Sequence, residues 1–293
     1  MALLRLSLLS LLIAINIVLH VPPLLAVAIV KAALPFARLR KASNPVLTGL
    51  AESWIGFNSW ALDRFTDTRV EVEMDAALQA DGHYLMLANH QSWVDILVLQ
   101  KVFNRRIPLM RFFLKRQLFW VPLLGLAWWA LDFPFMARHT HKQIARRPEL
   151  AGRDTVAIRR ACEKFRALPV TIVNFVEGTR FTPAKQARQG ASFRHLLKPK
   201  AGGVAFVLDA MGEGLHAILD VTIAFPGGRP TLWDLLAGRV SDIRIHVRQR
   251  PIPAELLGGD YQNDRAFRVR FQQWLNGLWL EKDAEVERLL AGG

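Results

Sequence analysis

The chain is poor in several kinds of residue, and each scarcity limits what it can be. Its 293 residues include one cysteine, so no intrachain disulfide can form and a reducing compartment is favoured. Only 25 acidic residues oppose 38 Lys and Arg, and the net charge of +13 requires an anionic partner: nucleic acid, an acidic membrane surface or a phosphorylated substrate. The Gly-X-Ser-X-Gly sequence is absent, which disfavours a covalent route through a serine nucleophile.

Charge is also scarce at the amino terminus. From Leu3 to Phe36 the only charged residues are Arg5 and Lys31, and Pro22-Pro23 interrupts an otherwise nearly continuous apolar stretch. About 20 apolar residues suffice to cross a bilayer, so one kinked span or two shorter re-entrant halves would both fit. A cleaved signal peptide is the alternative, but this stretch is too long for one. We therefore expect residues 1–65 to form a membrane-associated helical segment.

A basic cluster fixes the expected orientation of that segment. Arg38, Arg40 and Lys41 follow the apolar stretch directly. Because Lys and Arg beside a membrane segment mark its cytoplasmic side, we expect the rest of the chain to face the cytoplasm from the cytoplasmic (inner) membrane. The cluster lies on the wrong side for an exported protein.

Beyond residue 65, strand-like and helix-like patterns alternate without a repeat or a low-complexity linker. We expect an α/β fold in which a mostly parallel or mixed sheet is wrapped by helices, with an N-terminal apolar membrane helix or helical hairpin in front. Residues 66–293 would form one catalytic domain. The expected helices cover residues 44–66, 92–103, 115–122, 123–130, 154–167, 203–211, 232–237 and 263 or 264 towards 290, and the expected strands cover residues 69–74, 84–88, 107–113, 132–136, 170–175, 217–225 and 243–248.

A histidine and an aspartate follow the first buried strand. The apolar run Tyr84–Ala88 is followed by His90, and Asp95 lies near the start of the next helical pattern. We expect Asp95 to reach back to the imidazole, because a histidine held in one tautomer by a carboxylate can act as a general base. Ser92-Trp93-Val94-Asp95 also has the spacing of a capping box, so helix capping is an alternative role for Asp95.

A second buried run ends in Glu177-Gly178-Thr179-Arg180. Gly178 permits a tight turn, and Arg180 is suited to bidentate contact with a phosphate. Thr179 can add a hydroxyl, and Glu177 would orient Arg180 or bind a substrate hydroxyl. Ligand sites in α/β sheets gather at the carboxyl ends of strands, so we expect both loops to converge. An ordinary polar turn is the alternative.

Together these motifs resemble a known family. Asn89-His90 followed by Asp95 resembles the His-X4-Asp signature of the glycerolipid acyltransferases, and residues 175–180 resemble their second hallmark. Between the two, Lys115 and a block that ends in the basic residue Arg138 resemble the family's acceptor-binding region. Two hallmarks at a suitable distance are much more specific than either alone.

The resemblance implies transfer of a fatty acyl group from an acyl thioester to the free glycerol hydroxyl of a lysophospholipid, with 1-acylglycerol-3-phosphate as the foremost acceptor and phosphatidate as product. His90 would be the general base and Asp95 would fix its tautomer. Arg180, Lys115 and Arg138 would hold the acceptor phosphate. Acyl-CoA or acyl carrier protein would be the co-substrate, with no bound cofactor or metal. Anionic membrane lipid would be a further partner.

Three alternatives stay open. Residues 197–203 resemble the branch that acts on larger lysophospholipids, so a lysocardiolipin-like or lysophosphatidylinositol-like acceptor is the first. A basic, membrane-anchored scaffold or nucleic-acid-binding protein is the second, although the basic residues are spread out without a recognition motif, which makes nucleic acid an unfavoured partner. A hydrolase that gives the acyl group to water is the third.

Overall fold

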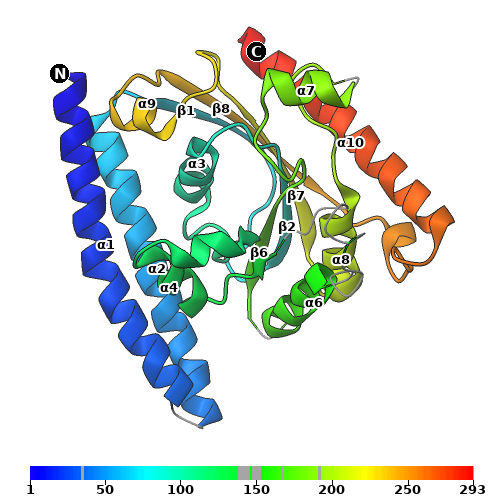
Figure 1. The fold of residues 1–293 in the computed structure, drawn as a ribbon, viewed down its shortest axis with the longest axis horizontal. Helices are drawn as coiled ribbons and strands as arrows, with labels where there is room; N and C mark the ends of the chain where they lie inside the picture. The colour runs from blue at the N-terminus through cyan, green and yellow to red at the C-terminus, as the bar shows by residue number, and fades with distance from the viewer. Residues whose placement is uncertain (34–35, 138–145, 147–152, 167, 191–192, 293) are drawn as a thin grey trace.

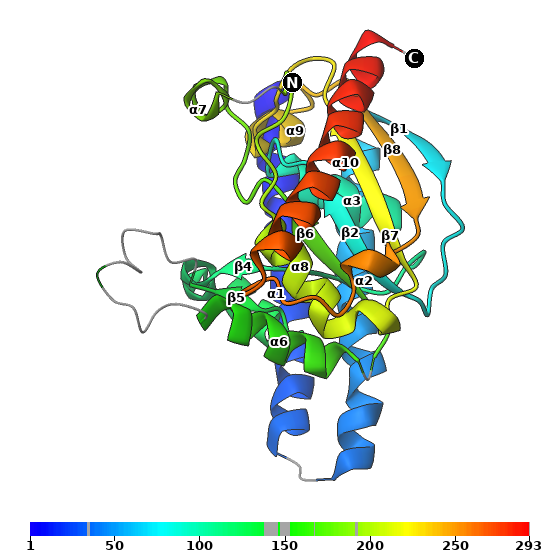
Figure 2. The ribbon, with the colours of Figure 1, turned by 90° about the vertical axis from the view of Figure 1, so that its right-hand side faces the viewer.

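The computed structural model describes residues 1–33, 36–137, 146, 153–166, 168–190 and 193–292. Its first two helices, α1 (Ala2–Ala33) and α2 (Ala37–Phe65), lie side by side as a hairpin (Figures 1 and 2). Apolar side chains of both helices belong to one buried cluster, and the Asn16 side chain donates to the Asn58 side-chain oxygen Oδ1 across the pair at 2.8 Å. The helix α1 continues through Pro22 and Pro23, so the two re-entrant halves considered from the sequence do not form.

A six-stranded sheet forms the centre of the chain after α2, in the order β1-β8-β7-β2-β6-β3. Every neighbouring pair is parallel except β7 and β8, which run antiparallel. The predicted mixed sheet wrapped by helices is therefore confirmed. The strands are β1 (Arg69–Asp75), β2 (His83–Ala88), β3 (Met110–Phe112), β6 (Val170–Phe175), β7 (Ala217–Ala224) and β8 (Asp242–Arg250).

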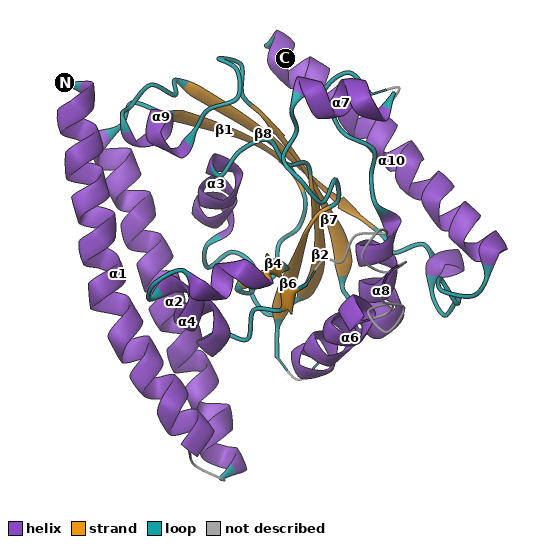
Figure 3. Cartoon of the chain, viewed as in Figure 1, coloured by secondary structure: helices purple, strands orange, loops and turns teal. Residues whose placement is uncertain are grey.

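Helices cover both faces of this sheet, as Figures 1 and 3 show. One face packs against α1, α2, α3 (Val94–Phe103), α4 (Leu124–Ala130) and α9 (Leu232–Leu236). The other packs against α6 (Arg153–Phe165), α8 (Ala201–Met211) and α10 (Arg265–Ala291). Alternate residues of β2 point to opposite faces, so Tyr84 and Met86 join the first cluster while Leu85 and Leu87 join the second. Burial on both sides explains why this strand reads as a continuous apolar run.

Several short elements connect these layers. They are β4 (Leu114–Lys115), β5 (Phe135–Met136), α7 (Pro183–Gln189) and the 3₁₀ helices η1 (Arg116–Trp120), η3 (Gly212–Gly214) and η4 (Ala254–Leu256). The sequence predicted longer strands at 107–113 and 132–136 and did not predict α7. Thr182 caps α7 and Gly190 ends it in the left-handed conformation, so its start and stop signals were present.

The register of the sheet determines where the catalytic motifs lie. Ala88, at the end of β2, pairs with Phe175, at the end of β6. The loops that begin at residues 89 and 176 therefore leave the sheet at the same edge, as the sequence predicted.

Candidate active site

His90 and Asp95 are joined by a hydrogen bond at the carboxyl end of β2. The imidazole Nδ1 lies 2.8 Å from Asp95 Oδ2. A carboxylate can only accept, so Nδ1 carries the proton and Nε2 is left with its lone pair. The Asp95 side chain is fully buried, whereas 15% of the His90 side chain is exposed. This geometry confirms that Asp95 reaches back to the ring, and it leaves His90 able to accept a proton at Nε2.

The same Asp95 oxygen also holds the start of α3. Oδ2 accepts from the backbone N–H groups of Gln91 at 2.6 Å and Ser92 at 2.8 Å. Ser92 Oγ in turn accepts from the Val94 N–H at 3.1 Å. The two roles that the sequence left open, helix capping and orientation of His90, are therefore performed by one carboxylate.

Contacts from several elements fix the backbone and the ring of His90. The ring stacks on Phe175 with centroids 4.0 Å apart and planes 15° apart. The His90 carbonyl accepts from the Phe181 N–H at 2.8 Å. The neighbouring Asn89 side chain donates to and accepts from the Ile223 main chain of β7, each bond being 2.8 Å. The histidine thus lies in a loop that is fixed to β6 and β7, which limits the positions its ring can adopt.

Glu177 lies beneath this loop and not at its surface. Its side chain is fully buried, and its two oxygens accept from the backbone N–H groups of His90 and Leu197, each at 3.0 Å. Burial raises the pKa of Glu177 to about 8, against the two backbone hydrogen bonds, which lower it. The expected contact of Glu177 with Arg180 or a substrate hydroxyl is corrected by this geometry: the carboxyl group positions two loops.

Gly178, Thr179 and Arg180 form the turn that follows. Gly178 has a φ of 69°, which other residues adopt only with strain. Thr179 Oγ1 accepts from Lys185 Nζ at 2.7 Å. Arg180 is exposed, and its guanidinium lies 5.1 Å from the centre of the Trp93 ring. Within the described part of the chain no carboxylate pairs with Arg180, so its charge is available to an anionic ligand.

The other two predicted phosphate ligands have different outcomes. Lys115 is exposed on β4, which pairs with β5. Burial lowers the pKa of Lys185, and the charges of Arg180 and then Lys115 lower it further. Arg138 lies outside the described residues.

Two lysines beside the turn were not singled out from the sequence. Lys185 lies on α7, the helix that periodicity failed to predict. Lys200 precedes α8, and its side chain crosses Gly178 so closely that a Cβ at that glycine would lie 3.2 Å from Lys200 Nζ. The cap signals of α7 could have revealed the first lysine, whereas the second lies within residues 197–203, whose resemblance pointed to the acceptor branch and not to a contact with Gly178.

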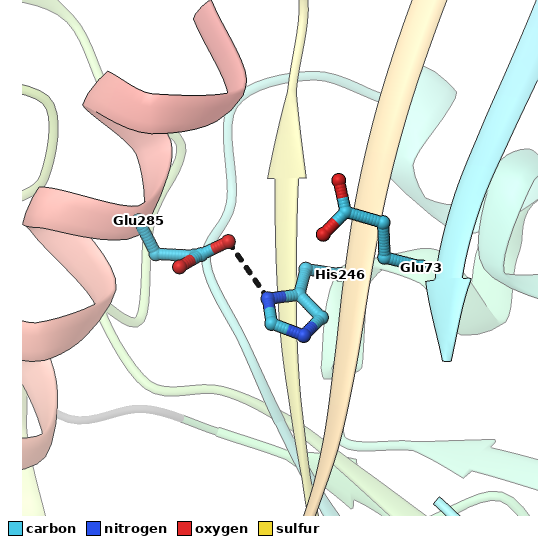
Figure 4. Close-up of side chains that lie close together, drawn as sticks. All are labelled: Glu73, His246 and Glu285. Carbon is cyan, nitrogen blue, oxygen red and sulfur yellow. Dashed lines mark hydrogen bonds and ion pairs between the residues drawn. The ribbon is translucent and has the colours of Figure 1, made fainter. Parts of the chain in front are cut away.

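One histidine and two glutamates, outside the candidate active site, have the composition of a metal site. Figure 4 shows Glu73 of β1, His246 of β8 and Glu285 of α10 close together. The Arg288 guanidinium donates to both glutamates, and the His246 nitrogens lie 2.7 Å from Glu285 and 2.8 Å from Asp75. A guanidinium therefore occupies the place that a cation would take, so these residues form an ion-pair network joining the sheet to α10.

Comparisons with known proteins were made on the sequence and on the fold. The family model described as Acyltransferase matches residues 69–226, a little over half of the chain. A 1-acyl-sn-glycerol-3-phosphate acyltransferase 3 of Arabidopsis thaliana is 27% identical over 247 residues, which cover 78% of this chain and 60% of that protein. A 1-acyl-sn-glycerol-3-phosphate acyltransferase gamma of Mus musculus is 28% identical over 218 residues, covering 70% and 53%. The chain thus spans between half and three fifths of the length of these curated relatives.

The fold also has a solved counterpart. The crystal structure of the 1-acyl-sn-glycerophosphate (LPA) acyltransferase PlsC from Thermotoga maritima superposes with a TM-score of 0.57, covering 100% of this chain and 99% of that one. The identity is 17%, so this likeness supports the fold alone.

Proposed function

Because the chain belongs to the glycerolipid acyltransferase family, we propose that it transfers a fatty acyl group from an acyl thioester to the free glycerol hydroxyl of 1-acylglycerol-3-phosphate, giving phosphatidate. One observation carries the proposal: His90 and Asp95 have the family's spacing and are hydrogen-bonded at 2.8 Å at the end of β2. The names of the relatives support the choice of acceptor.

The proposed reaction is direct transfer with His90 as the general base. Nε2 takes the hydroxyl proton while the hydroxyl oxygen attacks the thioester carbonyl carbon. The C–S bond then breaks, and the imidazolium returns the proton to the departing thiolate, which leaves an ester and a thiol. Asp95 keeps Nδ1 protonated and stabilises the imidazolium that forms. General base catalysis of this kind contributes roughly 10²–10⁴ in rate.

The acceptor phosphate would be held by Arg180, with Lys115 contributing charge. Both are exposed and lack a carboxylate partner among the described residues. Arg138, which lies outside those residues, is proposed for the same role from the family resemblance alone. The donor would be acyl-CoA or acyl carrier protein acting as a co-substrate, with no bound cofactor.

We propose that α1 attaches the chain to the cytoplasmic face of the inner membrane. Among the described residues, α1 alone is long and apolar enough to cross a bilayer by length and composition. Contacts tie it to the domain near both ends, because Arg5 pairs with Asp67 at 2.8 Å and Lys31 with Asp132 at 3.3 Å. An apolar row faces outward along the helix, and its members Leu4, Leu11, Ile15 and Val18 are each at least 42% exposed.

Tryptophan fluorescence can test this attachment. Trp60, Trp120 and Trp129 are exposed, whereas Trp54 and Trp128 are half-buried. If the exposed tryptophans lie at the lipid interface, brominated lipids will quench their emission in the wild type. The quenching is expected to fall when these three residues are replaced by Phe, and unchanged quenching would contradict their contact with lipid.

The activity is tested by supplying the protein in membranes with labelled acyl-CoA or acyl carrier protein thioester. We expect label in phosphatidate when 1-acylglycerol-3-phosphate is present, and about 10²–10⁴ less of it from His90→Ala, the matched control. A higher rate with lysocardiolipin or lysophosphatidylinositol would replace the proposed acceptor. Equal thioester loss without any acceptor would establish a hydrolase, and silence with every donor and acceptor would refute the enzyme.

A further inference from the structure

The Gly178–Arg180 turn lies between two lysines that no hallmark motif contains. On one side, Lys185 Nζ donates to Thr179 Oγ1 at 2.7 Å and to the Arg180 carbonyl at 2.8 Å. Both acceptors are neutral oxygens, so these bonds fix the ammonium group without cancelling its charge. Lys185 thus places a positive charge beside the turn, and its hydrogen bond to the carbonyl fixes the backbone of Arg180.

On the other side, Lys200 lies across Gly178. Its Nζ lies 3.2 Å from the position that a Cβ would occupy on that glycine, so the absence of a side chain at residue 178 makes room for the ammonium group. The Lys200 N–H donates to the Val176 carbonyl at 2.9 Å, which anchors the lysine to the same loop. Gly178 therefore permits both the positive φ of the turn and the close approach of the Lys200 ammonium group.

The cations around the turn are not neutralised. Some basic side chains of the protein are paired with carboxylates, as Arg250 is with Asp220 at 2.8 Å. Within the ranges that the structure describes, Arg180, Lys185 and Lys200 have no ion pair with a carboxylate. Burial, followed by the charges of Arg180 and Lys115, lowers the pKa of Lys185. Like charges held together without counter-charge form a site that an anion would stabilise.

We propose that Lys185 and Lys200 complete, with Arg180, a pocket for a phosphomonoester dianion, and that they make the protein prefer phosphomonoester over phosphodiester acceptors. A phosphomonoester carries a charge of about −1.5 to −2 at neutral pH, whereas a phosphodiester carries one negative charge. Three cations around one turn therefore discriminate between the two headgroups by charge. The inference rests on the proposed function for the acceptor, but its pocket can be tested by binding alone.

The test measures binding of lysophosphatidate and of lysophosphatidylglycerol in the same mixed micelles, without thioester, through the change in total tryptophan emission, to which Trp93 beside Arg180 contributes. Lys185→Met and Lys200→Met should each weaken lysophosphatidate binding by about 10- to 100-fold, because each removes a charge-assisted contact. Binding of lysophosphatidylglycerol should change by less than about threefold. Lys198→Met is the matched control, since this exposed lysine uses only its backbone N–H, towards Gln189.

Every outcome decides the proposal. Equal weakening of both ligands, no preference in the wild type, or a Lys198→Met effect equal to that of Lys200→Met would overturn it. Lys200 makes no side-chain hydrogen bond in the described structure, so its replacement stays informative if Lys185→Met fails to fold. Subsequent addition of acyl-CoA separates the two claims: selective binding without transfer would leave the pocket standing and refute the acyltransferase reaction.

Discussion

Replacing Glu177 by Gln tests how the buried carboxyl group supports the catalytic loop. The glutamine oxygen can accept one of the two backbone N–H groups, but its NH₂ group must then face the other. A buried donor left without an acceptor costs about 1–3 kcal/mol, so the variant should be less stable than the wild type by that amount in mild acid. Its kcat should fall too, because the His90 N–H is one of the two donors.

The stability difference should depend on pH. Burial raises the pKa of Glu177 to about 8 from a reference of 4.5, so the folded protein retains a proton that the unfolded chain has lost in this range. The wild type therefore loses stability as pH rises from about 4.5 to about 8, whereas the amide side chain of Glu177→Gln does not titrate. The gap between the two proteins should be largest below about pH 5 and should narrow towards about pH 8.

Urea unfolding in detergent micelles, followed by tryptophan fluorescence, gives the free energy of unfolding at each pH. Glu163→Gln is the control, because it removes an exposed carboxylate from α6 and should show no such trend. A gap that stays constant or widens with pH would refute the reasoning, since it would mean that Glu177 is buried as a carboxylate and is stabilised by its two N–H donors.

Two further predictions concern α10. Asp283 accepts from the backbone N–H groups of Arg194 and His195, each at 2.8 Å. These residues shortly precede Leu197, whose N–H donates to Glu177. Asp283→Asn should therefore lower kcat/KM about tenfold. Glu287→Gln alters an exposed side chain that contacts only the side chains of His195 and Arg194, so it should change kcat/KM little, and equal losses would contradict the path through Glu177. Burial alone would raise the pKa of Glu285, but hydrogen bonds from Arg288 and His246 lower this pKa to about 2. The stability that the carboxylate contributes above about pH 4.5 is therefore lost as pH falls towards 2. Discounted for solvent screening, this amounts to about 1–2 kcal/mol. The unfolding free energies of wild type and Glu285→Gln should converge as pH falls from about 4.5 towards 2, and a constant gap would refute it.

The sequence predicted the sheet well because its central strands are buried on both faces. The central run Val170–Phe175 forms β6 with the same ends. Arg69–Met74 forms all but the last residue of β1, an edge strand that was recognised from its alternation and not from burial. Burial produces long apolar or alternating patterns that periodicity detects. The short pieces β3 and β5 were over-predicted, because two or three paired residues leave no pattern of their own.

The candidate site was predictable where chemistry is local in sequence. His90 and Asp95 are five residues apart, so a strand end and a helix start were enough to place them together. Glu177 was misplaced because its partners are backbone N–H groups of distant loops, which leave no trace in composition. Lys200 reaches Gly178 only through the folding of α8 onto β6, and Lys185 depends on a short helix whose signals are caps instead of periodicity.

The most direct test of the central claim is acyl transfer to 1-acylglycerol-3-phosphate by wild type, His90→Ala and Asp95→Asn, each shown to be folded by circular dichroism. The account predicts that both variants lose about 10²–10⁴ in kcat/KM, because one removes the base and the other leaves its tautomer unfixed. Full activity in His90→Ala would contradict general base catalysis by this residue. Full activity in Asp95→Asn would reduce Asp95 to the cap of α3.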